Sequence, residues 1–203
     1  FQIENYHLYF LVGNVLWTFF SEATNGAMGS VLENSQLLKK VYIPKYMFPL
    51  EKCLFACVNL LFSMVAVLIV MAFSGVWPTA TFFLFPFVVL LCLVFAIGMG
   101  LLLSSLTVFF RDIMHLYGVV LTAWMYATPI IYPLDLANLP GIIVAVMQFN
   151  PMYYFVTMLR DVLLYNTVPS LSMWLCAATF AFGFLLLGLW CFKKKQDRFV
   201  LYV

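Results

Sequence analysis

Charged side chains are scarce in this sequence. Lys, Arg, Asp and Glu make up 9% of its 203 residues, whereas soluble domains carry roughly 25%. Hydrophobic residues make up 66%, and no water-soluble fold of this length could bury so much apolar surface. The composition therefore excludes a soluble domain and indicates an all-α integral membrane protein in a lipid bilayer. A net charge of +2 is too weak to indicate a nucleic-acid partner.

Residues that could carry catalysis or bind a metal are also few. The two histidines, His7 and His115, open different apolar segments. The five cysteines lie in or at the end of apolar runs, without the spacing of a metal site. The sequence contains no phosphate-binding glycine loop. We therefore expect no catalytic site, no metal and no cofactor bound by this chain itself.

Five apolar segments are long enough to cross a hydrocarbon core, which needs roughly 20 residues per helix. The first has a small, polar second half, which we expect to face protein because small residues let helices approach closely in lipid. Glu22 lies in this half and is an intramembrane polar candidate for function. The alternative is a structural carboxylate held by neighbouring polar groups. The five segments are residues 8–30, 53–73, 80–110, 113–132 and 171–192.

Two shorter apolar stretches, residues 141–149 and 152–165, lie before the last segment. Each is too short to cross, and Asn150-Pro151 between them is a turn and helix-start signal. The pair predicts a re-entrant helical hairpin, which enters the membrane and returns. One irregular full crossing is the alternative.

The distribution of Lys and Arg favours the hairpin. If the charged stretch at residues 37–52 is cytoplasmic, nine of the ten Lys and Arg fall inside and only Arg160 falls outside. The start of the chain, at Phe1, then lies outside and shows no signal peptide. We therefore expect five complete transmembrane helices plus the hairpin, in a single transmembrane domain over residues 1–203. A six-span parent protein would have lost its first span.

The charged stretch at residues 37–52 is predicted to form a cytoplasmic elbow. A residue before proline is disfavoured in helical geometry, which sets boundaries at Ile43 and Phe48. A short amphipathic piece is expected from Leu37 to Ile43, followed by a second turn limited by proline. Its apolar side chains should not face water. It therefore either lies on lipid headgroups or docks into another protein, and the residues alone leave both open.

Several stretches, in sequence order, resemble type-2 ABC exporter permeases. The resemblance is closest to the branch that exports lipid-linked polysaccharides, and it covers nearly the whole chain. The first amphipathic helix and the first span of that family are absent at the start. The similar stretches are Leu38-Lys39-Lys40-Val41-Tyr42-Ile43-Pro44 with Asn34-Ser35 before and Pro49-Leu50 after it, Phe110-Arg111-Asp112-Ile113, Pro129-Ile130-Ile131-Tyr132-Pro133, Asn150-Pro151-Met152 and the basic tail near Arg198-Phe199.

The resemblance implies a permease subunit in a bacterial cytoplasmic (inner) membrane. Two copies would assemble with two copies of a separate nucleotide-binding ABC ATPase, which would bind ATP and Mg. The cargo would be a lipid-linked glycan: O-antigen, capsular polymer or teichoic acid. An exporter of a small hydrophobic drug or lipid is the alternative. A membrane-embedded enzyme would need clustered Asp, Glu or His at one membrane face, which the sequence lacks.

The resemblance also implies roles for particular residues. The elbow would be the coupling helix that contacts the ATPase, and Arg111 and Asp112 would form the second cytoplasmic loop. The hairpin would line or gate the outer exit. Outer tyrosines could stack on sugars, or could instead be aromatic anchors at the headgroup level. The coupling residues are Leu37, Leu38, Lys39, Lys40, Val41, Tyr42, Ile43 and Pro44, and the cargo-path or gate residues are Tyr126, Tyr132, Asn150, Pro151, Tyr153 and Tyr154.

Overall fold

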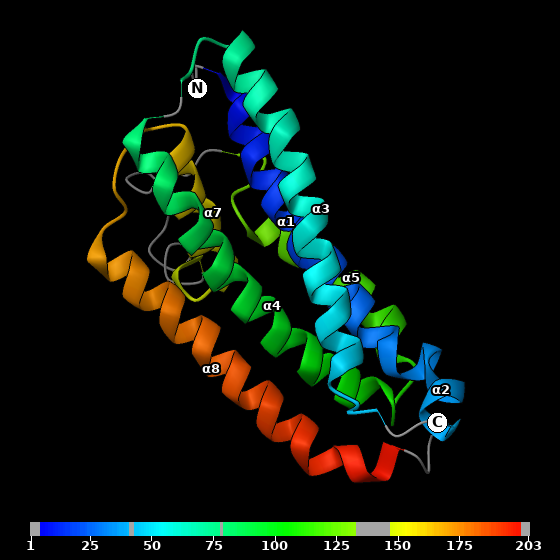
Figure 1. Cartoon of the computed structure of the whole chain (residues 1–203). Coiled ribbons are helices and arrows are strands. Elements are labelled where there is room, and N and C mark those ends of the chain that lie inside the picture. Colours follow the sequence, from blue (N-terminus) through cyan, green and yellow to red (C-terminus); the bar gives the residue numbers. More distant parts are fainter. Residues whose placement is uncertain (1–4, 41–42, 78, 133–146, 200–203) are drawn as a thin grey trace.

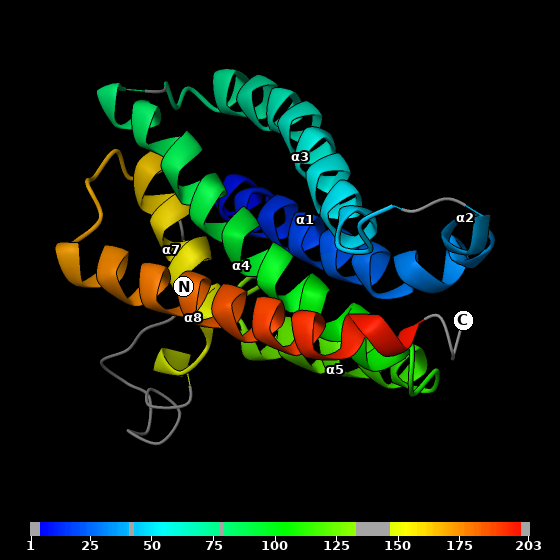
Figure 2. The same ribbon diagram turned by 60° about the horizontal axis from the view of Figure 1, so that its bottom comes forward.

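The structure, a computed structural model, describes residues 5–40, 43–77, 79–132 and 147–199. Its regular structure in these ranges is helical, which confirms the all-α prediction. The long helices form an elongated bundle in which α3 and α8 lie on opposite sides of α1 and α4 (Figures 1 and 2). The elements are α1 (Tyr6–Glu33), α2 (Ser35–Lys40), α3 (Met47–Phe73), η1 (Ala80–Leu84), α4 (Phe85–Thr107), α5 (Ile113–Ala127), α7 (Pro151–Leu163), α8 (Leu171–Lys195) and η2 (Gln196–Arg198).

The central helix of the bundle is α1, which packs against α3, α4, α5 and α7. Leu8, Val12, Leu16 and Phe20 are fully buried at helical spacing. Its second half buries mainly small residues, which confirms the prediction that this half faces protein. They are Ala23, Thr24, Ala27, Gly29 and Ser30.

The helix after the elbow, α3, begins at Met47, six residues before the start we predicted at Cys53. The expected boundary at Phe48 is therefore wrong. Pro49 lies in the first turn of α3, where backbone N–H groups have no partner within the helix. Proline is tolerated there, so it does not interrupt the helix.

Two glycines allow α4 and α8 to touch. A Cβ on Gly98 would lie 2.5 Å from the Leu185 backbone nitrogen, and a Cβ on Gly188 would collide with the Gly98 carbonyl oxygen. The backbones are therefore closer than any side chain permits. Small residues allow such close helix packing in lipid.

The fourth predicted segment, residues 113–132, forms a shorter helix than we expected. α5 ends at Ala127, and Thr128 is extended with φ −99° and ψ 133°. Pro129 follows, and proline pushes the preceding residue out of helical geometry. The 15 residues of α5 span roughly 22 Å, so this helix alone is shorter than a hydrocarbon core of about 30 Å.

The turn at Asn150-Pro151 begins α7, as predicted. The Asn150 side chain accepts a hydrogen bond from the Met152 backbone N–H at 3.0 Å, which caps the helix. Residues 141–146 of the first predicted hairpin arm lie outside the described residues. The hairpin therefore stays a prediction.

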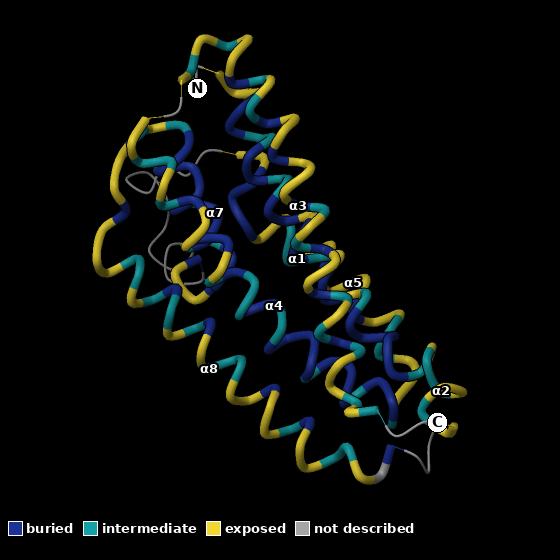
Figure 3. Tube along the Cα trace, in the orientation of Figure 1, coloured by how far each residue is buried: buried dark blue, intermediate teal, exposed yellow. Residues whose placement is uncertain are grey.

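Three helical segments in the described part of the chain are long and apolar enough to cross a membrane. They are Met47–Phe73, Ala80–Thr107 and Leu171–Lys195, and Ile113–Ala127 is a shorter apolar helix. Much of their apolar surface is exposed on the outside of the bundle (Figure 3); Phe62 and Phe73 on α3 are 72% and 89% exposed. Such faces require lipid or another protein chain. The count of five spans stays a prediction.

Candidate functional site

The elbow is exposed at the end of the bundle that carries α2. Within α2, Leu37 is 42% exposed and no residue is buried. Lys39 and Lys40 are exposed in its last turn. Val41 and Tyr42, which belong to the predicted coupling stretch, lie outside the described residues. The helix presents both charge and apolar surface, as a docking segment or a headgroup-bound segment requires.

The elbow also contacts the end of α8, which sequence reasoning did not anticipate. Leu38 packs against a buried cluster that includes Phe192 and Phe199. Nζ of Lys45 donates to the Gln196 carbonyl oxygen at 2.5 Å, and it lies 5.8 Å from the centroid of the Phe199 ring. The elbow is therefore connected directly to the C-terminal end of α8 and to the η2 turn that follows it. The sequence signal for this contact was Phe199, an aromatic residue that follows the run of lysines at residues 193–195.

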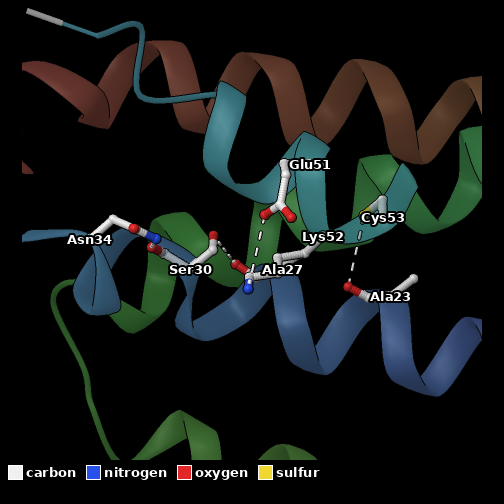
Figure 4. A network of polar contacts seen from close by, with 7 residues as sticks. All are labelled: Ala23, Ala27, Ser30, Asn34, Glu51, Lys52 and Cys53. Atoms are coloured by element: carbon white, nitrogen blue, oxygen red, sulfur yellow. Dashed lines mark hydrogen bonds and ion pairs between the residues drawn. The ribbon is translucent and has the colours of Figure 1, made fainter. Parts of the chain in front are cut away.

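Figure 4 shows polar contacts near the elbow, within α1, within α3 and between the two helices. Sγ of Cys53 lies 3.8 Å from the Ala23 carbonyl oxygen, and the Lys52 side chain covers Gly26 at 3.4 Å from where a Cβ would stand. Lys52 and Glu51 form a loose ion pair at 3.9 Å, with both side chains partly exposed. A pair of this kind contributes little to stability. Because both residues belong to α3, this pair does not join the two helices.

Glu22 is held by a neighbouring helix. Its Oε1 accepts a hydrogen bond of 2.6 Å from Nδ2 of Asn59 on α3. The bond joins α1 to α3, whereas the hydroxyl of Ser63 donates to the Asn59 carbonyl within its own helix. Glu22 remains exposed on the bundle surface. The contact supports the structural interpretation of this carboxylate and leaves a functional one untested.

The second predicted cytoplasmic loop, with Arg111 and Asp112, lies between α4 and α5. Both side chains are exposed. Backbone N–H groups of His115 and Leu116 donate to the Asp112 carbonyl oxygen, which begins α5. In the described residues these two side chains do not form an ion pair with each other. The loop is thus free to contact a partner.

At the opposite end of the bundle, Arg160 is a buried cation. It is 3% exposed. Its guanidinium donates to three backbone carbonyl oxygens: that of Tyr9 at 3.2 and 3.3 Å, that of Pro129 at 2.7 Å and that of Ile130 at 3.0 Å. It also lies 3.5 Å from the centroid of the Tyr9 ring. We call this arrangement the Arg160 cage.

The Arg160 cage joins three parts of the chain. Arg160 belongs to α7, Tyr9 to the first turns of α1, and Pro129 and Ile130 to the turn after α5. A Cβ on Gly13 would lie 2.5 Å from Nη2 of Arg160, so glycine leaves room for the guanidinium. No carboxylate of the described residues pairs with this cation. Carbonyl dipoles and one aromatic face therefore compensate its charge.

Asn150 connects the turn after α5 to α7. Its Oδ1 accepts from the Trp124 indole N–H at 2.8 Å, and its Nδ2 donates to Thr128 Oγ1 at 2.9 Å. Asn150 is 8% exposed and Pro151 is buried. Their side chains are packed against protein, so they position this end of the bundle and do not offer an open surface.

The four tyrosines predicted for a cargo path form two pairs, one before and one after Asn150 in the sequence. The Tyr132 hydroxyl donates to the Tyr126 carbonyl oxygen at 2.8 Å. The Tyr153 and Tyr154 rings meet edge to face with centroids 5.3 Å apart. Tyr126 is 63% exposed, so its ring is available to a partner. The structure therefore places exposed aromatic surface at the end opposite the elbow.

Comparison with known proteins gives consistent results. The family model described as ABC-2 type transporter matches residues 1–164. A Myxococcus xanthus protein named O-antigen export system permease protein RfbA is 27% identical over 198 residues, which cover 98% of this chain and 76% of that protein. Two Klebsiella pneumoniae proteins of the same name are each 24% identical over 201 residues, with the same coverage.

Proposed function

Because this chain belongs to the ABC-2 type transporter family, we propose that it is the membrane-spanning permease subunit of an ATP-driven exporter of lipid-linked polysaccharide. The observation that carries the proposal is its similarity, over 98% of its length, to proteins named as O-antigen export permeases. The chain is a multi-pass membrane protein. Capsular polymer and teichoic acid are further cargoes of the same chemistry.

The partner arrangement is part of the proposal. A separate ABC ATPase subunit binds ATP and Mg, and two permease copies assemble with two ATPase copies in the cytoplasmic membrane. The exposed apolar faces of α3, α5 and α8 support contacts with lipid and a second copy. In this arrangement the membrane is crossed by α1, α3, η1–α4, α8 and the predicted segment 113–132, which begins with α5. The predicted re-entrant hairpin, whose first arm lies partly outside the described residues, would be at the outer exit.

The elbow is proposed to receive motion from the ATPase and pass it to α8. Leu38 and Lys45 contact the end of α8. Leu37 is exposed and is therefore available to a partner. Motion of the elbow would thus reach α8, and through the Gly98–Gly188 contact also α4. A long polymer needs a continuous path with few fixed charges, which the sparse charge of this chain supplies.

Cargo identity can be tested by deleting the gene in a host that makes the polymer. We expect surface polymer to disappear and lipid-linked polymer to accumulate inside the cell, with restoration by the intact gene. Normal surface polymer together with altered resistance to small hydrophobic compounds would reject the polysaccharide proposal. That result would favour the small-cargo alternative.

Docking of the elbow can be tested with single cysteines. Leu37→Cys should crosslink to the ATPase subunit in the assembled complex, because its side chain is exposed on α2. Leu38→Cys is the matched control: it lies one position along the same helix and packs against the chain's own cluster. Crosslinking is measured by a mass shift on denaturing gels. Free labelling of Leu37→Cys by a bulky aqueous thiol reagent in the complex would instead place the elbow on the membrane surface.

The aromatic path is tested by a combined substitution of Tyr126, Tyr153 and Tyr154 with leucine. Export per assembled complex should fall several-fold, because stacking of an aromatic ring on a flat partner contributes about 1 kcal/mol and a sliding polymer contacts several rings. The matched control replaces the same three residues with phenylalanine, which keeps the rings and should preserve export. Equal export by the two triple variants, at equal assembly, would reject the aromatic path.

A further inference from the structure

A cavity of about 550 Å³ opens between the end of α4 and the last turns of α8. The ends of α4 and α8 that line it lie toward the end of the bundle that carries α2, away from α7 (Figure 1). On α8 its lining residues follow helical spacing, so they share one face. The lining consists of Phe109, Phe110, Trp190, Cys191, Lys194 and Lys195.

The walls of the cavity combine aromatic rings with two cations. Nζ of Lys194 lies 5.1 Å from the Trp190 ring centroid, and Nζ of Lys195 lies 5.6 Å from the Phe109 ring centroid. Near them Cys191 contacts Ser105 of α4, with Sγ and Oγ 3.3 Å apart. Among the described residues, no carboxylate lines the cavity and none forms an ion pair with either lysine. Its charge therefore suits an anion.

The position of the cavity selects the kind of anion. The apolar segments of α4 and α8 end at this level, so it lies where hydrocarbon meets water. Trp190 and Phe110 are each 65% exposed beside the lysines, and tryptophan is typical of this boundary. A soluble anion would gain nothing from these rings. A ligand with an acyl chain and a phosphate would contact both kinds of wall.

Helix dipoles oppose an anion here but are too weak to exclude one. The carboxyl ends of α4 and α8 each carry about half a negative charge. Lys194 and Lys195 supply two full positive charges at the same place. A net charge of about +1 therefore remains at the cavity. Each lysine near an anionic bilayer surface contributes about 1 kcal/mol of attraction.

We propose that this cavity binds the phosphate headgroup of an anionic phospholipid from the inner leaflet. Lys194 and Lys195 hold the phosphate, and one acyl chain lies along Trp190 and the rings at the end of α4. The site is adjacent to Phe192 and Phe199, against which the elbow packs. A bound lipid would therefore fix the junction between the elbow and α8. The proposal requires the membrane topology but is independent of the cargo.

The test measures lipid retained by the full permease after purification from nanodiscs of phosphatidylcholine with phosphatidylglycerol, by native mass spectrometry. Wild type should retain phosphatidylglycerol. Lys194→Gln should lower its affinity about fivefold and the variant with both lysines replaced about 25-fold. Lys193→Gln is the matched control, because Lys193 is an exposed neighbour of the same charge that does not line the cavity. Cys191→Phe, which places a bulky ring in the wall of the cavity and leaves the charge unchanged, should also weaken retention of the lipid.

Other results would overturn the proposal. Equal losses for Lys193→Gln and Lys194→Gln would mean diffuse charge attraction without a site. Displacement of phosphatidylglycerol by millimolar inorganic phosphate would indicate a soluble-anion site. Retention of a polyprenyl pyrophosphate in preference to phosphatidylglycerol would make the cavity a site for the lipid carrier of the cargo. Undiminished retention of lipid by a folded Cys191→Phe variant would show that the lipid binds elsewhere.

Discussion

Replacing Arg160 with leucine should destabilise the protein more than any other single loss of charge. The Pro129 and Ile130 carbonyl oxygens lie outside helices and accept hydrogen bonds from Arg160. Each buried acceptor left without a partner costs about 1–3 kcal/mol. The thermal unfolding midpoint in detergent should therefore fall by on the order of 10 °C. The contact between α7 and α1 should loosen at the same time.

Two further variants identify the cause. Arg160→Lys keeps the charge, but one compact ammonium cannot reach the carbonyl oxygens that the planar guanidinium contacts together. Its unfolding midpoint should lie between wild type and Arg160→Leu. Arg111→Leu removes an equal charge from an exposed loop and should change the midpoint little. If Arg160→Leu unfolds at the same temperature as Arg111→Leu, the cage does not stabilise the protein.

Adding one methyl group at Gly98 or Gly188 should separate α4 from α8. The atoms that a Cβ would meet at Gly98 are the backbone nitrogen and Cα of Leu185, at 2.5 and 2.7 Å. Backbone cannot rotate away as a side chain can, so the helices must move apart. We expect Gly98→Ala and Gly188→Ala each to cost about 3 kcal/mol. The double variant should cost less than the sum, because it opens the same contact once.

Gly183 supplies the matched control for these variants. It lies on α8, and a Cβ there would meet nothing within 4 Å. Gly183→Ala should leave stability unchanged or raise it by up to about 1 kcal/mol, because alanine favours helix more than glycine does. The measurement is again thermal unfolding in detergent. A loss of stability in Gly183→Ala equal to that in Gly98→Ala would mean that the close approach of α4 and α8 has no special cost.

The sequence predicted those features that depend on local pattern. The last span was predicted at residues 171–192, and α8 covers Leu171–Lys195. This prediction succeeded because a long, continuous run of apolar residues is enough to indicate a helix in lipid. Asn150-Pro151 was recognised because its cap needs only its own neighbours. Pro49 was misjudged because proline interrupts a helix interior but fits its first turn. The end of α5 was missed because apolar residues continue past the break at Thr128.

The Arg160 cage could not be predicted in this way. We counted Arg160 only as a charge on the outer side, whereas its role depends on carbonyl oxygens from two distant segments. One local signal was present. Arg160 lies four residues after Val156 and three before Leu163, on the apolar face that α7 buries. A cation at a core position of an apolar helix indicates a partner, although the sequence does not identify it.

The Arg160 cage also has a consequence for the order in which the protein is built. Arg160 follows Tyr9 by 151 residues, so a ribosome must synthesise most of the chain before the guanidinium can reach α1. During that time the carbonyl oxygens of α1 and of the turn after α5 lack their final hydrogen-bond donor. Long-range contacts of this kind form last because they close the longest loops. The contact between α1 and α7 is thus among the last to form.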